Sequence, residues 1–128
     1  MTNLIFIAMG GAAGALLRYA VSGFVHNYAS GAFPWGTLVV NLSGCLVIGI
    51  LWQMFENLSF SPNMRSFIFI GMLGAYTTFS TYGLETFNLL REKEIGYVLL
   101  NFLGSNIIGV GMVFLGFIAA RLVFNIAR

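Results

Sequence analysis

Within the stretch GAYTTFSTYG (Gly74–Gly83) of an apolar segment, five of the six residues 77–82 carry a hydroxyl group. They are Thr77, Thr78, Ser80, Thr81 and Tyr82. Hydroxyls donate and accept hydrogen bonds, and inside a helix they offer the backbone alternative partners. Glycine, serine and threonine are also weak helix formers. The stretch therefore predicts a helix break between Gly74 and Phe79, surrounded by hydrogen-bonding groups.

A second set of chemically informative residues lies near the N-terminus. The sequence GGAAGALLRY places Gly10, Gly14 and Arg18 at four-residue steps, so they share one helix face. Gly10 and Gly14 form a GxxxG pattern, which allows close helix contact. A charge inside a membrane costs at least about 2.5 kcal/mol. Arg18 therefore either snorkels to the helix end or forms the positive mouth of a water-filled vestibule that attracts anions.

Two further segments carry isolated amides. Asn41, in GTLVVNLSGC, would either hold helices together or line a polar path. Asn101, Ser105 and Gly109 fall at four-residue steps and form a polar stripe of small residues. That stripe fits either a helix-packing seam or the wall of a path.

The elements that position these residues follow from the composition. Of the 128 residues, 59% are hydrophobic and 8% are charged, against about 25% charged in an ordinary soluble domain. A chain of this size could not bury so much apolar surface in water. We therefore predict an all-α membrane protein with a single domain, residues 1–128. A spanning helix needs about 20 apolar residues, and four segments qualify: 4–25, 37–55, 67–90 and 95–126.

Basic residues are balanced between the two sides of the membrane. Each side carries three: Arg65, Arg121 and Arg128 on the side of the termini, and Arg18, Arg91 and Lys93 on or toward the other. The positive-inside rule therefore selects no orientation. We expect insertion in both orientations, with two opposed copies pairing about a two-fold axis in the membrane plane. Four helices enclose little room, so a conduit is expected at a dimer interface.

Several classes of function find no support in the sequence. The spans carry no acid–base pair, no metal-ligand cluster and no nucleotide-binding glycine motif. The net charge of +2 is small and dispersed, which gives no basis for nucleic-acid binding. We predict a polar path and no enzyme. One alternative is a small proton-coupled multidrug exporter, which would need a carboxylate in the first span, where this chain has Arg18. The other is a structural membrane subunit without transport.

The motifs GGAAGALLRY, GTLVVNLSGC and GAYTTFSTYGLE, in this order and spacing, resemble the Fluc (also called CrcB) family of small fluoride channels. The resemblance covers nearly the whole chain and is most specific in the third motif. It implies four-helix subunits that form antiparallel, dual-topology dimers in the plasma membrane of a prokaryote, surrounded by membrane lipid. Such dimers conduct fluoride passively out of the cell and so confer resistance to fluoride.

The resemblance also implies roles for individual residues. The fluoride pathway would comprise Asn41, Phe79, Ser80, Thr81, Tyr82 and Ser105. Arg18 and Glu85 would be charges in the vestibule or at the pore end. The backbone carbonyls of Gly74 and Thr77 would hold a structural Na⁺ at the dimer interface. Fluoride only accepts hydrogen bonds, so hydroxyls, amides and the positive edges of aromatic rings suit it. A fixed cation would offset the cost of an anion in a low dielectric.

Two positions depart from the usual family pattern. Tyr82 stands where phenylalanine is usual, and Ala75 where a second glycine is common. We predict that the pore tolerates Tyr82, because the ring edge remains and the hydroxyl is a donor. Some family members pair two unlike chains, so a heterodimer with a related chain stays open beside the homodimer.

Overall fold

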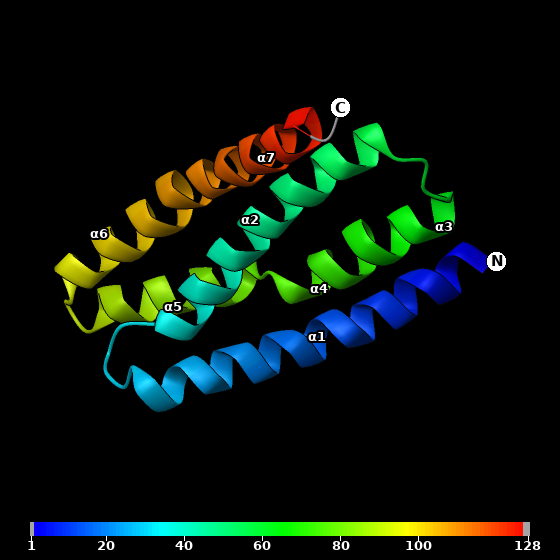
Figure 1. Ribbon diagram of the computed structural model, residues 1–128. Coiled ribbons are helices and arrows are strands. Elements are labelled where there is room, and N and C mark those ends of the chain that lie inside the picture. Colours follow the sequence, from blue (N-terminus) through cyan, green and yellow to red (C-terminus); the bar gives the residue numbers. More distant parts are fainter. Residues whose placement is uncertain (1, 127–128) are drawn as a thin grey trace.

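The computed structural model describes residues 2–126, and these fold into helices joined by short turns (Figure 1). Four helices are long and apolar enough to cross a membrane: Asn3–Tyr28, Trp35–Asn57, Pro62–Arg91 and Ile95–Asn125. The predicted all-α protein with four spans is confirmed.

The spans are built from nine helical elements within the described residues. The first span is α1 (Thr2–Tyr28) and the second is α2 (Trp35–Asn57). The third comprises α3 (Pro62–Arg65), the π-helical η1 (Ser66–Leu73), α4 (Gly74–Tyr76) and α5 (Phe79–Arg91). The fourth comprises α6 (Ile95–Leu103), the π-helical η2 (Gly104–Ile108) and α7 (Gly109–Ile126).

The first three spans are longer than their apolar segments predict. The third begins at Pro62 rather than at residue 67, because local capping chemistry starts a helix there. The Ser61 hydroxyl accepts a hydrogen bond from the Met64 N–H at 3.3 Å, and Pro62 occupies the first helical position. Hydropathy measures what lipid can cover, whereas caps decide where the helix begins and ends.

The third span is broken where the hydroxyl cluster predicts. Thr77 has φ −79° and ψ 157°, and Thr78 has φ −148° and ψ 119°, so both residues are extended. The Thr78 hydroxyl accepts a hydrogen bond from the Thr81 N–H at 3.3 Å and thereby caps α5. The span is therefore two half-helices joined by two extended residues, visible between α4 and α5 in Figure 1.

Glycines set the closest helix contacts. α1 lies along η1 and α4, and α2 lies along α7 (Figure 1). A Cβ at Gly10 would overlap the Phe67 carbonyl oxygen, and one at Gly14 would overlap that of Met72. The GxxxG contact predicted for the first span is therefore present. Its partner is the first half of the third span.

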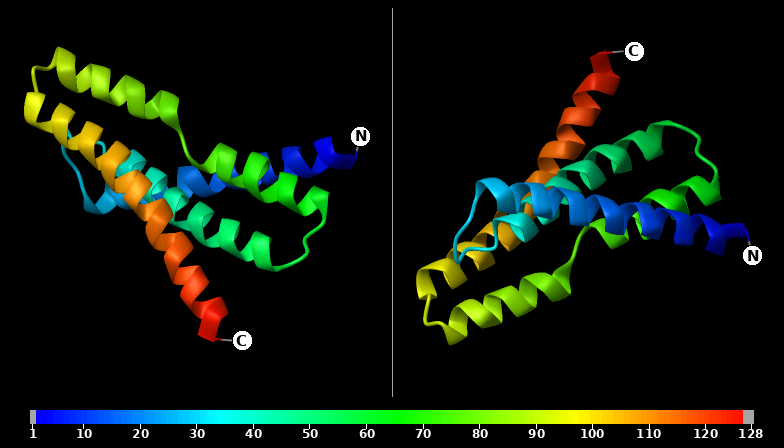
Figure 2. Two further views of the ribbon diagram at one scale, coloured as in Figure 1. Left: turned by 90° about the horizontal axis from the view of Figure 1, so that it is seen from above. Right: turned by 90° about the horizontal axis from the view of Figure 1, so that it is seen from below.

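The ends of the bundle are arranged as an even number of spans requires. The start of α1, the helix α3 and the end of α7 lie at one end, and the two turns before α2 and α6 lie at the other (Figure 1). Figure 2 shows α7 and the start of α1 diverging at their shared end. Arg65 and Arg121 belong to this end, whereas Arg128 lies outside the described residues.

Little of the chain is buried within the single subunit. Most large apolar side chains are exposed, as expected for helices that face lipid or a partner. Among side chains less than 2% exposed, the largest are Val40 and Asn101. The buried polar side chains are Thr37 and Gln53 of α2, Thr78 of the break and Asn101 of α6.

Candidate ion pathway

The break in the third span is held by one side chain of α2. The Asn41 Nδ2 donates to the Thr78 carbonyl at 3.1 Å, and the Thr78 N–H donates to Asn41 Oδ1 at 2.8 Å. The side-chain amide thus pairs with a peptide group in both directions. The sequence predicts that Asn41 either holds helices together or lines a polar path. It joins α2 to the break in the third span, and it also lines a cavity.

This pairing changes the hydrogen bonding of the neighbouring carbonyls. In a continuous α-helix the Thr78 N–H would donate to the Gly74 carbonyl, and the Thr81 N–H to that of Thr77. Instead, the Thr78 N–H donates to Asn41 and the Thr81 N–H donates to the Thr78 hydroxyl. The Gly74 and Thr77 carbonyls therefore lack their helical donors, and they are oxygen ligands available to a cation.

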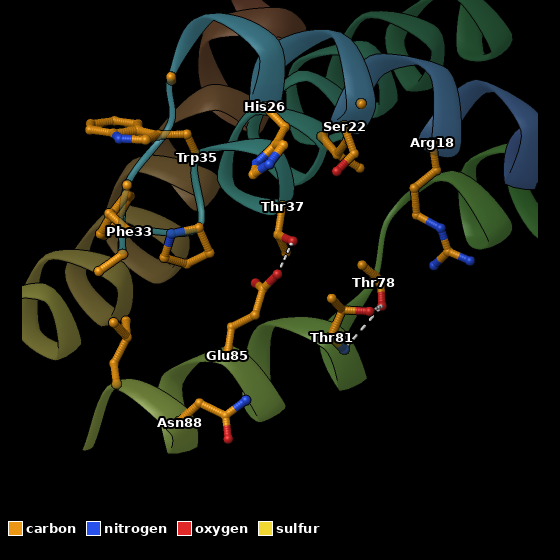
Figure 3. Close-up of a pocket in the computed structure, with 18 of the residues that line it drawn as sticks. Arg18, Ser22, His26, Phe33, Trp35, Thr37, Thr78, Thr81, Glu85 and Asn88 are labelled. Carbon is orange, nitrogen blue, oxygen red and sulfur yellow. Dashed lines mark hydrogen bonds between the residues drawn. The ribbon is translucent and has the colours of Figure 1, made fainter. Parts of the chain in front are cut away.

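Thr78 lines two separate cavities. The first has a volume of about 770 Å³ and lies toward the turn before α2 (Figure 3). The second has a volume of about 330 Å³ and lies beside the break. Most candidate residues line one or the other: Arg18, Thr81 and Glu85 the first, and Asn41, Gly74, Thr77, Phe79, Tyr82 and Ser105 the second.

The first cavity carries both candidate charges. Figure 3 shows Arg18 reaching into it from α1 and Glu85 from α5. Arg18 lies well before the end of α1 at Tyr28, which favours the vestibule over snorkelling to the helix end. The Thr37 hydroxyl donates to Glu85 Oε1 at 2.7 Å. Glu85 Oε2 is buried and has no hydrogen-bond partner among the described residues.

The second cavity combines aromatic and polar groups. The Phe79 and Tyr82 rings lie with centroids 5.4 Å apart and planes tilted by 50°. Tyr82 is 7% exposed, whereas Phe79 is 80% exposed in the single subunit. The Asn106 Nδ2 donates to the Tyr82 hydroxyl oxygen at 3.1 Å. Aromatic, hydroxyl and amide side chains thus line a common cavity.

The polar stripe of the fourth span contributes one residue to helix packing and another to the second cavity. Asn101 is 1% exposed, and its Nδ2 donates to the Thr86 hydroxyl at 2.9 Å, joining α6 to α5. Asn101 is therefore a packing residue, consistent with the seam reading. Ser105, one turn further on, donates to Asn101 Oδ1 at 3.5 Å and lines the second cavity.

The structure separates Ser80 from the other candidates. Its side chain is exposed and lines neither cavity, although its hydroxyl lies 3.4 Å from that of Thr78. Sequence reasoning missed Thr78 and Thr37 as site residues. A hydroxyl directly before a half-helix is a capping signal that could have found Thr78. Nothing local predicts the contact of Thr37 with Glu85, 48 positions away.

The chemistry available for a metal ion is limited to oxygen donors of the backbone and hydroxyls. Within residues 2–126 no group of three or more His, Cys, Asp or Glu residues could hold a metal. A site for a transition metal therefore has no basis there. The Gly74 and Thr77 carbonyls, which lack their helical N–H donors, suit a hard monovalent cation better than they suit a transition metal.

Comparison with known proteins agrees with this geometry. The family described as "CrcB-like protein, Camphor Resistance (CrcB)" matches residues 5–117. The chain belongs to the CrcB family. It is 44% identical to the fluoride-specific ion channel FluC of Desulforapulum autotrophicum over 94% of this chain and 98% of that one. It is 47% identical to FluC of Salinibacter ruber over 91% and 87% of the two chains. FluC of Parabacteroides distasonis is 39% identical over the full length of both.

Proposed function

We infer that this chain forms a fluoride-selective ion channel through which fluoride leaves the cell passively, and that it thereby confers resistance to fluoride. The observation that carries this conclusion is the broken third span, where Thr78 lines two cavities that hydroxyl and amide side chains also line. The relatives are named for fluoride conduction, and the cavities supply the donors that an acceptor-only anion needs. A channel of this family is not an enzyme.

The broken helix supports an anion path in a second way. α5 begins at Phe79 inside the membrane span, so the positive end of its dipole lies beside both cavities. The Thr81 N–H donates to the Thr78 hydroxyl. The other N–H groups in the first turn of α5 have no acceptor within the helix. An anion that passes the break loses water next to these donors, which lowers the cost of dehydration.

We propose that two copies pair in opposite orientations. Ser80 and Asn106 are exposed in the single subunit although they lie within membrane-spanning helices. Polar groups at such depth face protein or a water-filled cavity rather than lipid. A second copy would cover them, and the balanced basic residues remove the barrier to opposed insertion. A homodimer is the simplest such assembly, and a heterodimer with a related chain is the alternative.

We further propose a structural Na⁺ held at the dimer interface by the Gly74 and Thr77 carbonyls. The support is the redirection of their two helical donors to Asn41 and Thr78. Bound there, the ion would supply positive charge close to the anion path. Purified protein passed through a sodium-free, potassium-based buffer should lose activity and regain it on sodium addition, if exchange is complete. Activity unchanged after the protein-bound sodium has been shown to be gone would contradict the proposal.

The plasma membrane of a prokaryote is the proposed location, and the bacterial source of the relatives supports it. The multi-pass topology itself follows from the four spans. No observation favours the multidrug exporter, because α1 carries no carboxylate. A structural subunit without transport would not need the two cavities.

The experiment that tests the function is anion efflux from liposomes containing this chain alone. Fluoride and chloride are run in parallel, with protein-free liposomes as the control. Rapid fluoride loss with retained chloride is the expected result. If a folded, dimeric preparation released neither ion, the homomeric channel would be excluded. Equal release of both ions would exclude selectivity.

A further inference from the structure

The Tyr82 hydroxyl has an unusual position for a phenol in a membrane protein. The Tyr82 side chain is buried and lines the second cavity, and its hydroxyl lies against η2. Its hydrogen-bond partner is Asn106, 3.1 Å away. In the described part of the chain it has no other hydrogen-bond partner. A buried phenol normally finds partners for both its oxygen and its proton, so the destination of the proton needs an explanation.

The direction of the hydrogen bond follows from a third atom. The same Asn106 Nδ2 lies 2.8 Å from the Phe102 carbonyl oxygen. A carbonyl can only accept, so the nitrogen rather than the oxygen of the amide must face it. The atom 3.1 Å from the Tyr82 oxygen is therefore a donor. Tyr82 accepts from Asn106, and its own proton is left for another acceptor.

We propose that the Tyr82 hydroxyl, oriented by Asn106, is a halide-binding donor in the second cavity. This inference rests on the proposed function and deepens it. The Phe79 and Tyr82 ring edges offer only weakly positive C–H groups, whereas a hydroxyl offers a full hydrogen bond. Asn106 is a positioning residue, because it occupies the oxygen lone pair and turns the proton toward the cavity. A phenylalanine at position 82 would keep the edge and lose the donor.

The test measures how fluoride efflux depends on fluoride concentration. Tyr82→Phe should raise the half-saturating concentration about tenfold, the size expected for one hydrogen bond to an ion. The maximal flux should be kept or increased, because the ion leaves a weaker site faster. Asn106→Leu should raise the half-saturating concentration less, since the hydroxyl remains but is no longer held. The double variant should behave as Tyr82→Phe alone, because Asn106 acts through the hydroxyl.

A matched control is available within the same span. The half-buried Tyr76 also has a hydrogen-bonded hydroxyl, 2.7 Å from the Ser43 hydroxyl, but it lines neither cavity. Tyr76→Phe should leave the half-saturating concentration unchanged while costing a similar amount of stability. An unchanged concentration dependence in Tyr82→Phe, or effects of the two single variants that simply add, would overturn the inference while the channel function stood. A native chain without any fluoride flux would overturn both.

Discussion

At the scale of single residues, the side-chain amide of Asn41 takes the place of a backbone peptide group. Its amide makes the two hydrogen bonds that a neighbouring backbone would make with Thr78, at 3.1 and 2.8 Å. Thr78 is only 9% exposed, so water could replace these two bonds only in part. The sequence predicts that Asn41 is polar and inside the membrane. It cannot predict the partner, because residues 37 positions apart are brought together only by the packing of α2 on the third span.

Replacing Asn41 should therefore destabilise the protein. Asn41→Leu keeps the size of the side chain but leaves the Thr78 N–H and carbonyl unpaired. Each buried unpaired group costs about 1–3 kcal/mol, so we expect a loss of about 2–6 kcal/mol in the free energy of unfolding in detergent. Asn57→Ala is the control, because the Asn57 side chain is exposed and bonds only within α2. Equal losses in the two variants would contradict the pairing role.

Arg18 should act on conduction through its charge. In Arg18→Gln liposomes, fluoride efflux at low ionic strength should fall severalfold, because the first cavity loses the charge that concentrates anions. The difference should shrink when an impermeant salt is added, since the screening length falls from about 10 Å at 0.1 M to about 3 Å at 1 M. Arg121→Gln, at an exposed position of α7, should show neither effect. A defect that does not respond to salt would indicate a structural role for Arg18 instead.

At the scale of elements, local chemistry predicts some features and misses others. The break in the third span could be predicted because several adjacent residues weaken one helix, and it lies at Thr77 and Thr78 as expected. The π-helical segments η1 and η2 were not predicted. η2 contains the weak helix formers Gly104, Ser105 and Asn106, and η1 contains Ser66 and Gly71. Weak helix propensity does not specify the extra residue per turn, so we attribute the π-helical geometry to packing.

The contact between α1 and the third span gives a sharp test. Gly14→Ala should destabilise the protein by about 1–3 kcal/mol, because the added Cβ would overlap the Met72 carbonyl and force the helices apart. Gly11→Ala places a methyl group where nothing lies within 4 Å. It should be neutral, or stabilising by up to about 1 kcal/mol through its helix propensity. Thermal unfolding in detergent compares the two. Similar shifts for both would argue against a close contact at Gly14.

At the scale of the whole molecule, composition predicts the spans and their number, whereas the assembly depends on surfaces that one chain leaves open. The exposed polar side chains of Ser80 and Asn106 support the proposed partner surface, but they do not give the orientation of the partner. The count of basic residues suggests opposed insertion, yet it depends partly on Arg128, outside the described residues. Orientation therefore has to be measured.

Opposed insertion predicts a specific labelling pattern. In a Cys45→Ser background, Glu92→Cys places a thiol in the turn before α6, and Ser59→Cys places one at the other end of the bundle. A membrane-impermeant reagent applied to intact cells should label about half of each variant, because each end faces outward in half the copies. Permeabilisation should complete the labelling. Full labelling of one variant and none of the other would establish a single orientation.

The pairing of Asn41 with Thr78 also bears on the order in which the protein is assembled. A third span that enters lipid before α2 is beside it has no partner for an extended Thr78, and an unpaired peptide group in hydrocarbon costs several kcal/mol. Such a span closes into a continuous helix, in which the Gly74 and Thr77 carbonyls recover their donors. We therefore expect the break to form after insertion, when the third span docks against α2. The geometry of the Gly74 and Thr77 carbonyls would then arise late in folding.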